Sequence, residues 1–457
     1  MRKITYLLLA LLVIAASSSA KLKQKLELFP DGTPIPTWFA DTTGIELKNM
    51  GKPYIITDFG VKNDSTIIQT EAIQSVIDKC HSASGGVIVI PEGTYLTGSL
   101  FFKPGVNLYL SENATLKGSD AITHYKIVKT RLEGQTLNYF AALINADHHD
   151  GFTIAGKGTL NGNGYKFYDE FWLRRKVIKG CTNLEALRPR LVYISNSADV
   201  KVCGIRMVNS GFWTNHLYKC QRVKYLNCYI YAPTEGYPKG PSTDAIDIDA
   251  CEDMLIRGCW VNVNDDGVCI KGGKGTFVDK DSTNGPCRNI IVENCYFKKA
   301  GGGVTFGSEC YDASNVIIRN SQFNGTSNIL LFKMRPDTPQ KYMNVLAENC
   351  TGTTRFGIRT RVWKQFFNKQ EREDMPRSIV SNVTARNLKV HCTEGFYRLS
   401  PSEDYDLGNF SFYDIDATDP MGEMDTSFLK SCQINHVKIN GKVIASHTAK
   451  EASQIAP

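Results

Sequence analysis

Two stretches of the sequence decide the fold: "CQRVKYLNCYI", Cys220 to Ile230, and "CEDMLIRGCWV", Cys251 to Val261. They align residue for residue, and five further stretches share their pattern, beginning at Ser197, Cys287, Ala313, Tyr342 and Val380. In each stretch the fourth residue is apolar or β-branched, and the ninth is Ile, Cys, Ser or Leu. Consecutive starts lie 23 (220 − 197) to 38 (380 − 342) residues apart, so we expect variable loops between the repeats.

Such short β-rich segments cannot bury an apolar face alone, and we expect them to stack as coils about 4.8 Å apart. Helical periodicity is found in one place, "TEAIQSVIDKC", before Gly85 and Gly86. One face of that helix would hold Ala72, Ile73, Val76, Ile77 and Cys80. A helix ahead of the coils suits a cap over the open end of the core. The sequence therefore predicts an all-β, single-domain parallel β-helix with an N-terminal capping helix.

The 14 cysteines follow the same repeat. One repeat position is shared by Cys220, Cys251 and Cys287, and another by Cys228, Cys259, Cys295 and Cys350. Inward columns of this kind pack as small hydrophobic residues, although stacked Cα atoms about 5 Å apart would also permit disulfides. We expect mostly free, buried thiols. The sequence has no CxxC pair and no histidine cluster, so we expect no metal site and no cofactor.

Three carboxylates occur where a polar turn enters an apolar strand: Asp244 in "STDAIDIDAC", and Asp265 and Asp266 in "NVNDDGVCIKGG". The 21 residues (265 − 244) between them are about one short coil, so stacking would place all three on one lateral face. Crowded like charges drive one pKa upward while others stay deprotonated. Such a split supplies the acid and the base that cleavage of a glycosidic bond requires.

The alternative for acidic turns on a solenoid is that they are solvated or bind calcium. We prefer this interpretation for Asp247, Asp249 and Asp253. Alternation along "DAIDID" points Ile246 and Ile248 one way and the first two of these aspartates the other way. For the trio of Asp244, Asp265 and Asp266, the residues alone leave catalysis and this alternative open.

Several longer stretches resemble one known family. They include "DFGVKNDSTIIQTEAIQSVIDKC", "GGVIVIPEGTYLTGSLFFKPGVNLYLSENATLKGS", "GKGTLNGNG", "RPRLVYISNSADV" and "NSGFWTNHLYKC". Ser242-Thr243-Asp244, Asn264-Asp265-Asp266 and Lys271-Gly272-Gly273 stand where that family has Asn-Thr-Asp, Gly-Asp-Asp and Lys-Ser-Gly. From about residue 54 to 390 the chain is similar to the polygalacturonase family, glycoside hydrolase family 28. The resemblance implies a right-handed, pectin-lyase-like parallel β-helix that degrades pectin.

The resemblance also implies roles for the carboxylates. Asp265 would be the general acid that protonates the leaving oxygen, while Asp244 and Asp266 would activate and orient the attacking water. Assistance of this kind is typically worth about 10²–10⁴-fold in rate. Direct attack by water would invert the anomeric carbon. Inverting enzymes usually hold their carboxyl groups about 6.5–9.5 Å apart, whereas adjacent coils predict a closer set; we follow the resemblance. Lys271 would bind substrate.

Two positions depart from the family pattern. In "GGGVTFGS", Gly302 stands where the family has a histidine, and His216 is a candidate to compensate from another coil. Leu331 replaces the arginine of the family's Arg-Ile-Lys, while Lys333 keeps the lysine. Because Lys333 and Arg335 are two residues apart in one strand, they would share a face and bind a uronate carboxylate as a pair.

The next stretch, "RFGIRTRVWKQFF", interleaves cations with an aromatic ring. We expect Arg361 and Trp363 to contact an acidic sugar chain.

The two ends of the chain carry separate expectations. Residues 1–20 have the basic, apolar and small-residue pattern of a secretory signal peptide, which predicts cleavage near Ala20 and a periplasmic or extracellular protein. Residues 21–50 would form an N-terminal extension and residues 51–457 the β-helix domain. No later stretch is long enough for a membrane span, and no basic run suggests a nucleic-acid partner. We expect a monomer.

The leading hypothesis is an exported hydrolase of α-galacturonosidic linkages in pectin, an acidic poly- or oligosaccharide. Insertions such as "YAPTEGYPKGPS" and "KGTFVDKDSTNGP" would wall off one side of a groove and favour attack at chain ends. The runner-up is a rhamnogalacturonan hydrolase of the same family, because altered histidine and arginine positions imply an altered sugar. Two further alternatives are a polysaccharide lyase and a glycan-binding β-helix without catalysis.

Overall fold

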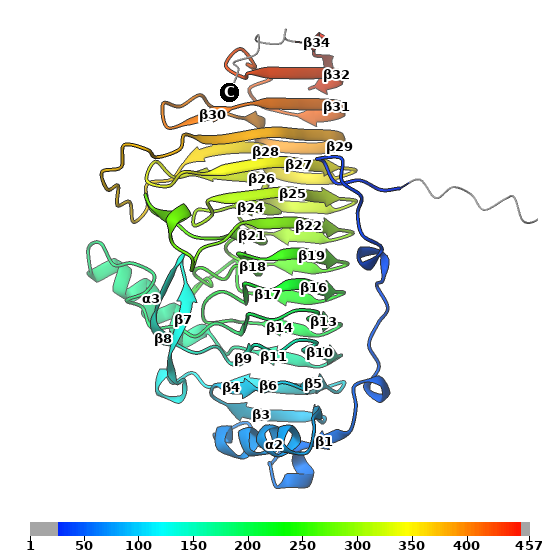
Figure 1. Ribbon diagram of the computed structural model, residues 1–457, viewed down its shortest axis with the longest axis vertical. Coiled ribbons are helices and arrows are strands. Elements are labelled where there is room, and N and C mark those ends of the chain that lie inside the picture. Colours follow the sequence, from blue (N-terminus) through cyan, green and yellow to red (C-terminus); the bar gives the residue numbers. More distant parts are fainter. Residues whose placement is uncertain (1–25, 449–457) are drawn as a thin grey trace, which may run out of the picture.

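The computed structural model describes residues 26–448, which form three stacks of parallel strands wound around one core (Figure 1). The predicted right-handed parallel β-helix is confirmed. The proposed signal peptide at residues 1–20 lies outside the described residues. Among the described residues, no helix has the length and apolar character needed to cross a bilayer.

Each of the seven coils from β2 to β24 contributes one strand to each stack, and the first stack has further strands at both ends. The first stack contains β1 (Pro53–Ile55), β2 (Gly86–Ile90), β5 (Val106–Leu110), β10 (Thr153–Gly156), β13 (Lys201–Cys203), β16 (Gln221–Leu226), β19 (Glu252–Arg257), β22 (Cys287–Glu293), β25 (Asp312–Arg319) and β27 (Lys341–Glu348). The second contains β3 (Gly93–Thr97), β6 (Ala114–Gly118), β11 (Thr159–Asn161), β14 (Arg206–Val208), β17 (Tyr229–Tyr231), β20 (Trp260–Asn262) and β23 (Tyr296–Lys299). The third contains β4 (Leu100–Phe102), β9 (Ile144–Asp147), β12 (Val192–Ser195), β15 (Asn215–Tyr218), β18 (Ile246–Asp249), β21 (Val268–Lys271) and β24 (Val304–Phe306).

The last coils have longer strands that bend from one stack into the next. They are β26 (Gln322–Met334), β28 (Thr351–Val362), β29 (Ser378–Arg398), β30 (Tyr405–Leu407), β31 (Asn409–Thr418) and β32 (Ser431–Ile439). Two short antiparallel strands, β33 (Lys442–Val443) and β34 (His447–Thr448), pair with β32. Short 3₁₀ turns are η1 (Thr37–Ala40), η2 (Leu47–Asn49), η3 (Ile56–Phe59), η4 (Ile122–His124) and η5 (Val278–Lys280).

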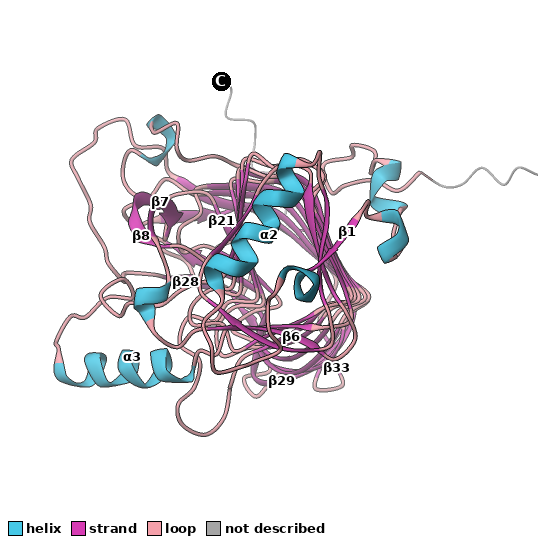
Figure 2. Cartoon of the chain, turned by 90° about the horizontal axis from the view of Figure 1, so that it is seen from below, coloured by secondary structure: helices cyan, strands magenta, loops and turns pink. Residues whose placement is uncertain are grey.

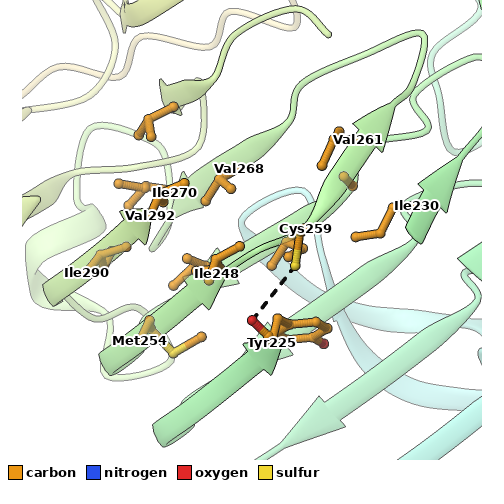
Figure 3. Packing of buried hydrophobic residues seen from close by; sticks show 14 of the residues in the cluster. Tyr225, Ile230, Ile248, Met254, Cys259, Val261, Val268, Ile270, Ile290 and Val292 are labelled. Carbon is orange, nitrogen blue, oxygen red and sulfur yellow. Dashed lines mark hydrogen bonds between the residues drawn. The ribbon is translucent and has the colours of Figure 1, made fainter. Parts of the chain in front are cut away.

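The repeat alignment is confirmed at the level of single residues. The fourth position of six repeats forms one continuous register column, Val223, Met254, Ile290, Val316, Val345 and Val383. Each of these side chains is at most 1% exposed. Figure 3 shows how such inward columns interlock, with the Cys259 thiol directed at the backbone carbonyl of Tyr225, 3.8 Å away. All the described cysteines are free and buried.

A second column, made of asparagine side chains, lies at the turn between the first and second stacks. Asn294, Asn320, Asn349 and Asn387 all have φ between 51° and 54°, the left-handed region that asparagine tolerates better than most residues. Their side chains also bond along the axis, from Asn349 to Asn320 at 3.0 Å and from Asn387 to Asn349 at 2.6 Å. Asparagine therefore both makes the turn and joins neighbouring coils.

The predicted cap is also present. The helix α2 (Thr70–Ser82) covers the first coils and buries Ile73, Val76, Ile77 and Cys80, whereas Ala72 stays exposed (Figure 2). Residues 26–50 run along the outside of the first stack (Figure 1). There Phe29 and Phe39 cover an outward apolar patch that includes Leu226, Leu255 and Ile291.

Two insertions stand outside the coils, on the side of the third stack (Figures 1 and 2). They are the antiparallel hairpin of β7 (Ile127–Leu132) with β8 (Gln135–Phe140), and the helix α3 (Tyr165–Val177). Neither follows the repeat. Both lie beside the face on which the predicted carboxylates were placed.

Candidate active site

The third stack brings the three predicted carboxylates together. Asp244 precedes β18, and Asp265 and Asp266 precede β21 on the next coil. The two loops are joined by a backbone hydrogen bond, in which Ala245 N donates to the Asp266 carbonyl oxygen at 2.9 Å. Consequently one carboxylate oxygen from each of the three residues lies within 4.8 Å of the others.

The trio lines a cavity of about 190 Å³. Burial, with the charges of Asp247 and Asp265, raises the pKa of Asp244 well above its usual value. Burial and the adjacent Asp266 charge also raise the pKa of Asp265. For Asp266, burial alone would raise the pKa, but the positive charges of Lys333 and Lys271 outweigh it and lower the pKa. The site therefore holds two carboxyl groups that favour the protonated form beside one that favours the ionised form.

Both oxygens of Asp266 are held by neighbouring coils. The Thr305 hydroxyl donates to Oδ1 at 2.9 Å, and Lys333 Nζ lies 2.5 Å from Oδ2. A Cβ atom on Gly302 would approach Thr305 Oγ1 to 2.4 Å, so no side chain fits there while Thr305 keeps this position. Where the family has a histidine, this chain thus has Gly302, and the space beside it is occupied by the Thr305 hydroxyl group, which contacts Asp266 directly.

Lys271 sits among the other acidic groups. Its Nζ lies 3.2 Å from Glu309, 3.6 Å from Asp247 and 3.8 Å from Asp244. The same ammonium lies 4.6 Å from the centre of the Trp213 ring. Burial alone would raise the pKa of Glu309, but the charges of Lys271, Lys274 and Arg335 and the hydrogen bond from Ser308 together outweigh it and lower the pKa. Lys271 is therefore the cation that compensates this part of the cluster.

The expectation that Asp247 and Asp249 are solvated is wrong, whereas calcium binding, the other part of that expectation, stays a prediction. Both side chains are 0% exposed, because the face of β18 that looks away from the core is covered by neighbouring elements. Asp249 accepts a hydrogen bond from Arg131 Nε at 3.1 Å. Asp247 has no hydrogen-bond partner for either oxygen among the described residues, and burial raises its pKa well above the usual value. Asp253 is half-buried and accepts a hydrogen bond from Asn289.

His216 is not part of the cavity wall. Its side chain is 0% exposed, with Nδ1 2.6 Å from Arg190 Nη1 and Nε2 3.4 Å from Asp249 Oδ2. Burial lowers its pKa to about 4, so the imidazole is neutral at ordinary pH. The proposed compensation for Gly302 by direct contact with substrate is therefore wrong, because His216 is enclosed in a structural network.

Arg335 also takes a different place from the one expected. It lies just beyond the end of β26, is 2% exposed, and forms two hydrogen bonds with Asp337 at 2.8 and 2.7 Å. It also donates to the carbonyl oxygen of Gln365 at 2.9 Å. The predicted pairing of Arg335 with Lys333 in the site is thus wrong. Instead, Arg335 supports the loop that carries Trp363 and Gln365 into the cavity wall.

The second cation beside Lys333 is Arg361, its register partner on the next coil. Lys333 Nζ lies 4.7 Å and the Arg361 guanidinium 5.0 Å from the centre of the Trp363 ring. Of these three, Lys333 and Trp363 line the cavity, while Arg361 is exposed beside it.

The insertions contribute cavity residues that the repeat pattern did not reveal. Arg175 comes from α3, Asn183 from the loop that follows it, and Glu133 from the tip of the β7–β8 hairpin. They are connected: Arg175 Nη2 donates to Asn183 at 2.8 Å, and Asn183 donates to Glu133 at 2.7 Å. Their segments do not follow the repeat, so no periodic signal in the sequence places them.

By distance alone, the trio could hold a metal ion, as could Asp244, Asp247 and Cys269. Lys271 and Lys333 already supply positive charge next to these carboxylates. We therefore assign no metal to the site, and the expectation that no cofactor is needed stays a prediction.

The substitution Lys271→Met should destabilise the protein by about 3–5 kcal/mol at pH 7, because it leaves buried carboxylates without their cation. The depressed pKa of Glu309 contributes stability above its unfolded pKa, which is lost as the pH falls. The difference in free energy of unfolding between the parent and the variant should therefore become smaller below about pH 4. Urea unfolding at several pH values measures this difference in stability. Lys280→Met is the control, because Lys280 and Asp374 form an exposed pair that solvent screens. Equal effects of both substitutions would contradict this role.

The chain is similar in sequence to proteins described as polygalacturonases and galacturonosidases. An exo-poly-α-D-galacturonosidase of Dickeya chrysanthemi is 35% identical over 297 residues, covering 55% of this chain and 47% of the relative. A probable polygalacturonase of Vitis vinifera is 27% identical over 227 residues, covering 48% and 44%. The chain thus spans about half the length of these curated relatives.

Solved structures agree on the fold. An exopolygalacturonase from Thermotoga maritima superposes with a TM-score of 0.68 at 21% identity, covering 88% of this chain and 94% of that one. A polygalacturonase from Erwinia carotovora gives 0.62 at 19% identity, covering 88% and 100%. Residues 80–354, more than half of the chain, match the family model "Glycosyl hydrolases family 28". The resemblance in the sequence is confirmed, and this chain belongs to glycosyl hydrolase family 28.

Proposed function

We propose that this protein is a glycosidase that hydrolyses α-galacturonosidic linkages in pectin and removes sugars from chain ends. The observation that carries the proposal is the carboxylate trio, in which groups of opposite protonation preference line one small cavity. The relatives named above support galacturonate as the sugar. The pattern of residues 1–20 supports action outside the cytoplasm.

In the proposed mechanism, Asp265 protonates the leaving oxygen. Its raised pKa keeps a proton available, as a general acid requires. Asp266, whose pKa is lowered, accepts a proton from the attacking water, and Asp244 orients that water. The step breaks the glycosidic C–O bond and forms a C–O bond to the water oxygen. The leaving oxygen gains the proton of Asp265, the water gives one proton to Asp266, and exchange with solvent then restores both carboxyl groups.

Attack by water rather than by Asp266 is supported by the contacts of that carboxylate. Both of its oxygens already accept hydrogen bonds, from Thr305 and Lys333, which suits a base better than a nucleophile that must bond to carbon. The close spacing of the trio would by itself favour retention, since retaining enzymes place their carboxyl groups about 5–5.5 Å apart.

The first product should therefore carry the inverted anomeric configuration. Proton NMR in the first minutes of digestion, before mutarotation, identifies the anomer formed. A first product of retained configuration would rule out direct attack by water.

The shape of the cavity supports action at chain ends. The hairpin tip at Glu133 and Gly134 closes one side: a Cβ on Gly134, at φ 75°, would lie only 3.1 Å from the Glu309 Cβ and 3.2 Å from Lys274. The hairpin therefore packs directly on the loops beside the trio. A polysaccharide cannot continue through this wall, so a terminal sugar is the unit that fits.

Arg175 is the cavity cation with spare capacity for a uronate carboxylate. Lys271 and Lys333 already face carboxylates of the protein. Arg175 has no carboxylate partner among the described residues and donates to the neutral side chain of Asn183. Its guanidinium stacks 4.6 Å from the Phe171 ring centre, which fixes its orientation. Arginine and carboxylate match as two parallel hydrogen bonds.

The main test is digestion of a panel of pectic oligosaccharides, read by mass. The parent should release galacturonate from homogalacturonan, and Asp265→Asn should be slower by about 10²–10⁴-fold because the acid is lost. Asp416→Asn, in an exposed part of β31, is the matched control and should leave the rate unchanged.

Other outcomes identify the alternatives. Turnover of rhamnogalacturonan instead of homogalacturonan would indicate the runner-up. A product that absorbs ultraviolet light and a loss of activity with chelator would indicate a lyase. If the parent turns over none of these substrates, the result would indicate a glycan-binding protein without catalysis.

A second test concerns the chain end. Arg175→Ala should raise KM for galacturonate oligomers by about 10–100-fold with little change in kcat, because a charge-assisted contact is worth about 1.5–3 kcal/mol. Steady-state kinetics measures this. Arg174→Ala is the control, since Arg174 pairs with Glu170 on the same helix and does not line the cavity. If both substitutions give the same KM as the parent, Arg175 does not bind the sugar.

A further inference from the structure

The third stack carries a second hollow, larger than the catalytic cavity. Its volume is about 650 Å³, within the range of about 300–1,000 Å³ that is typical of ligand sites. Its floor consists of β4, β9 and β12 with the end of β15, which belong to the coils before the carboxylate trio. The β7–β8 hairpin separates it from the catalytic cavity.

The separating wall is held by buried charges. Arg131 of β7 is 1% exposed and donates to Asp249 at 3.1 Å and to Asn284 at 2.7 Å. Arg190 donates to the carbonyl oxygen of Arg131 at 2.8 Å and to Thr130 at 2.7 Å. These contacts join the hairpin to the sheet below it and to the loop beside it. The hairpin that lies between the two hollows is therefore anchored on both sides.

The lining of the second hollow fits an acidic sugar. Phe101, Tyr193 and Tyr218 supply half-buried rings, which suit the apolar faces of pyranose units. Its charged side chains are mainly cations, Lys103, Lys129, Arg131 and Lys219, against the single carboxylate of Asp147.

The contacts within this lining identify which charged groups are available to a ligand. Asp147 already accepts hydrogen bonds from Ser195 and Asn196 at 2.7 and 2.8 Å. Lys129 is exposed and has no ion pair among the described residues. Lys103 already pairs with Asp78 at 2.9 Å and Arg131 with Asp249 at 3.1 Å. Lys129 and Lys219 are therefore the lining cations that have no carboxylate partner among the described residues.

We propose that this hollow is a non-catalytic binding site for an anionic oligosaccharide. A single, hydrogen-bonded carboxylate cannot supply both an acid and a base, so the site holds a chain without cleaving it. The choice of galacturonate as the bound acid rests on the proposed function. A chain bound here would keep the enzyme on a polysaccharide while free ends enter the catalytic cavity.

Isothermal titration with a galacturonate tetramer tests the proposal, using the full chain with Asp265→Asn so that the ligand survives. Two binding events per chain are expected. Adding Lys129→Glu should weaken one of them at least tenfold and leave the other unchanged. Lys438→Glu, on an exposed position of β32, is the control and should retain both events. A neutral tetrasaccharide of glucose should not bind the second site.

A single binding event that Lys129→Glu leaves unchanged would overturn the second site. The proposed hydrolysis is judged separately, by turnover of the parent on galacturonate trimers. Two binding events with no turnover would overturn the proposed hydrolysis and support the second binding site. Turnover with a single binding event that Lys129→Glu leaves unchanged would support the hydrolysis and overturn the second site.

Discussion

The in-register hydrogen bonding between neighbouring coils of the third stack is the constraint on which the site depends. Ile246 stands opposite Val268, and the backbone of Ala245 bonds to that of Asp266. A slip of one residue would turn the side chains of a strand to the opposite face. The apolar columns prevent such a slip, because a slipped strand would expose its apolar side chains to solvent. Core packing therefore determines where two distant loops meet.

Bringing carboxylates so close is costly, and the structure offsets the cost with two lysines. Lys333 lies against Asp266, and Lys271 lies among Asp244, Asp247 and Glu309. The uneven placement of these cations, together with burial, separates the protonation preferences within the trio. Electrostatics that stabilise the fold therefore also prepare the chemistry that we propose.

The insertions decide what the site can accept. The β7–β8 hairpin divides one long face into a small, acidic compartment and a larger, basic one, and α3 adds a cation to the first. Neither insertion contributes to the register of the coils. They can therefore change substrate access without disturbing the core, which fits the general separation of scaffold and function.

The sequence by itself determined the coils, their register and the capping helix, because these follow from local periodicity and residue type. It also predicted the meeting of Asp244 with Asp265 and Asp266, since the spacing is about one coil. Only the tertiary structure decided the burial of Asp249, the enclosure of His216 and the turning of Arg335 toward Asp337. The physical reason for the first two is that Arg131 and Arg190, which contact Asp249 and His216, come from other coils or insertions whose positions no repeat encodes. Arg335 lies just past Met334, where β26 ends, so strand alternation no longer sets the direction of its side chain.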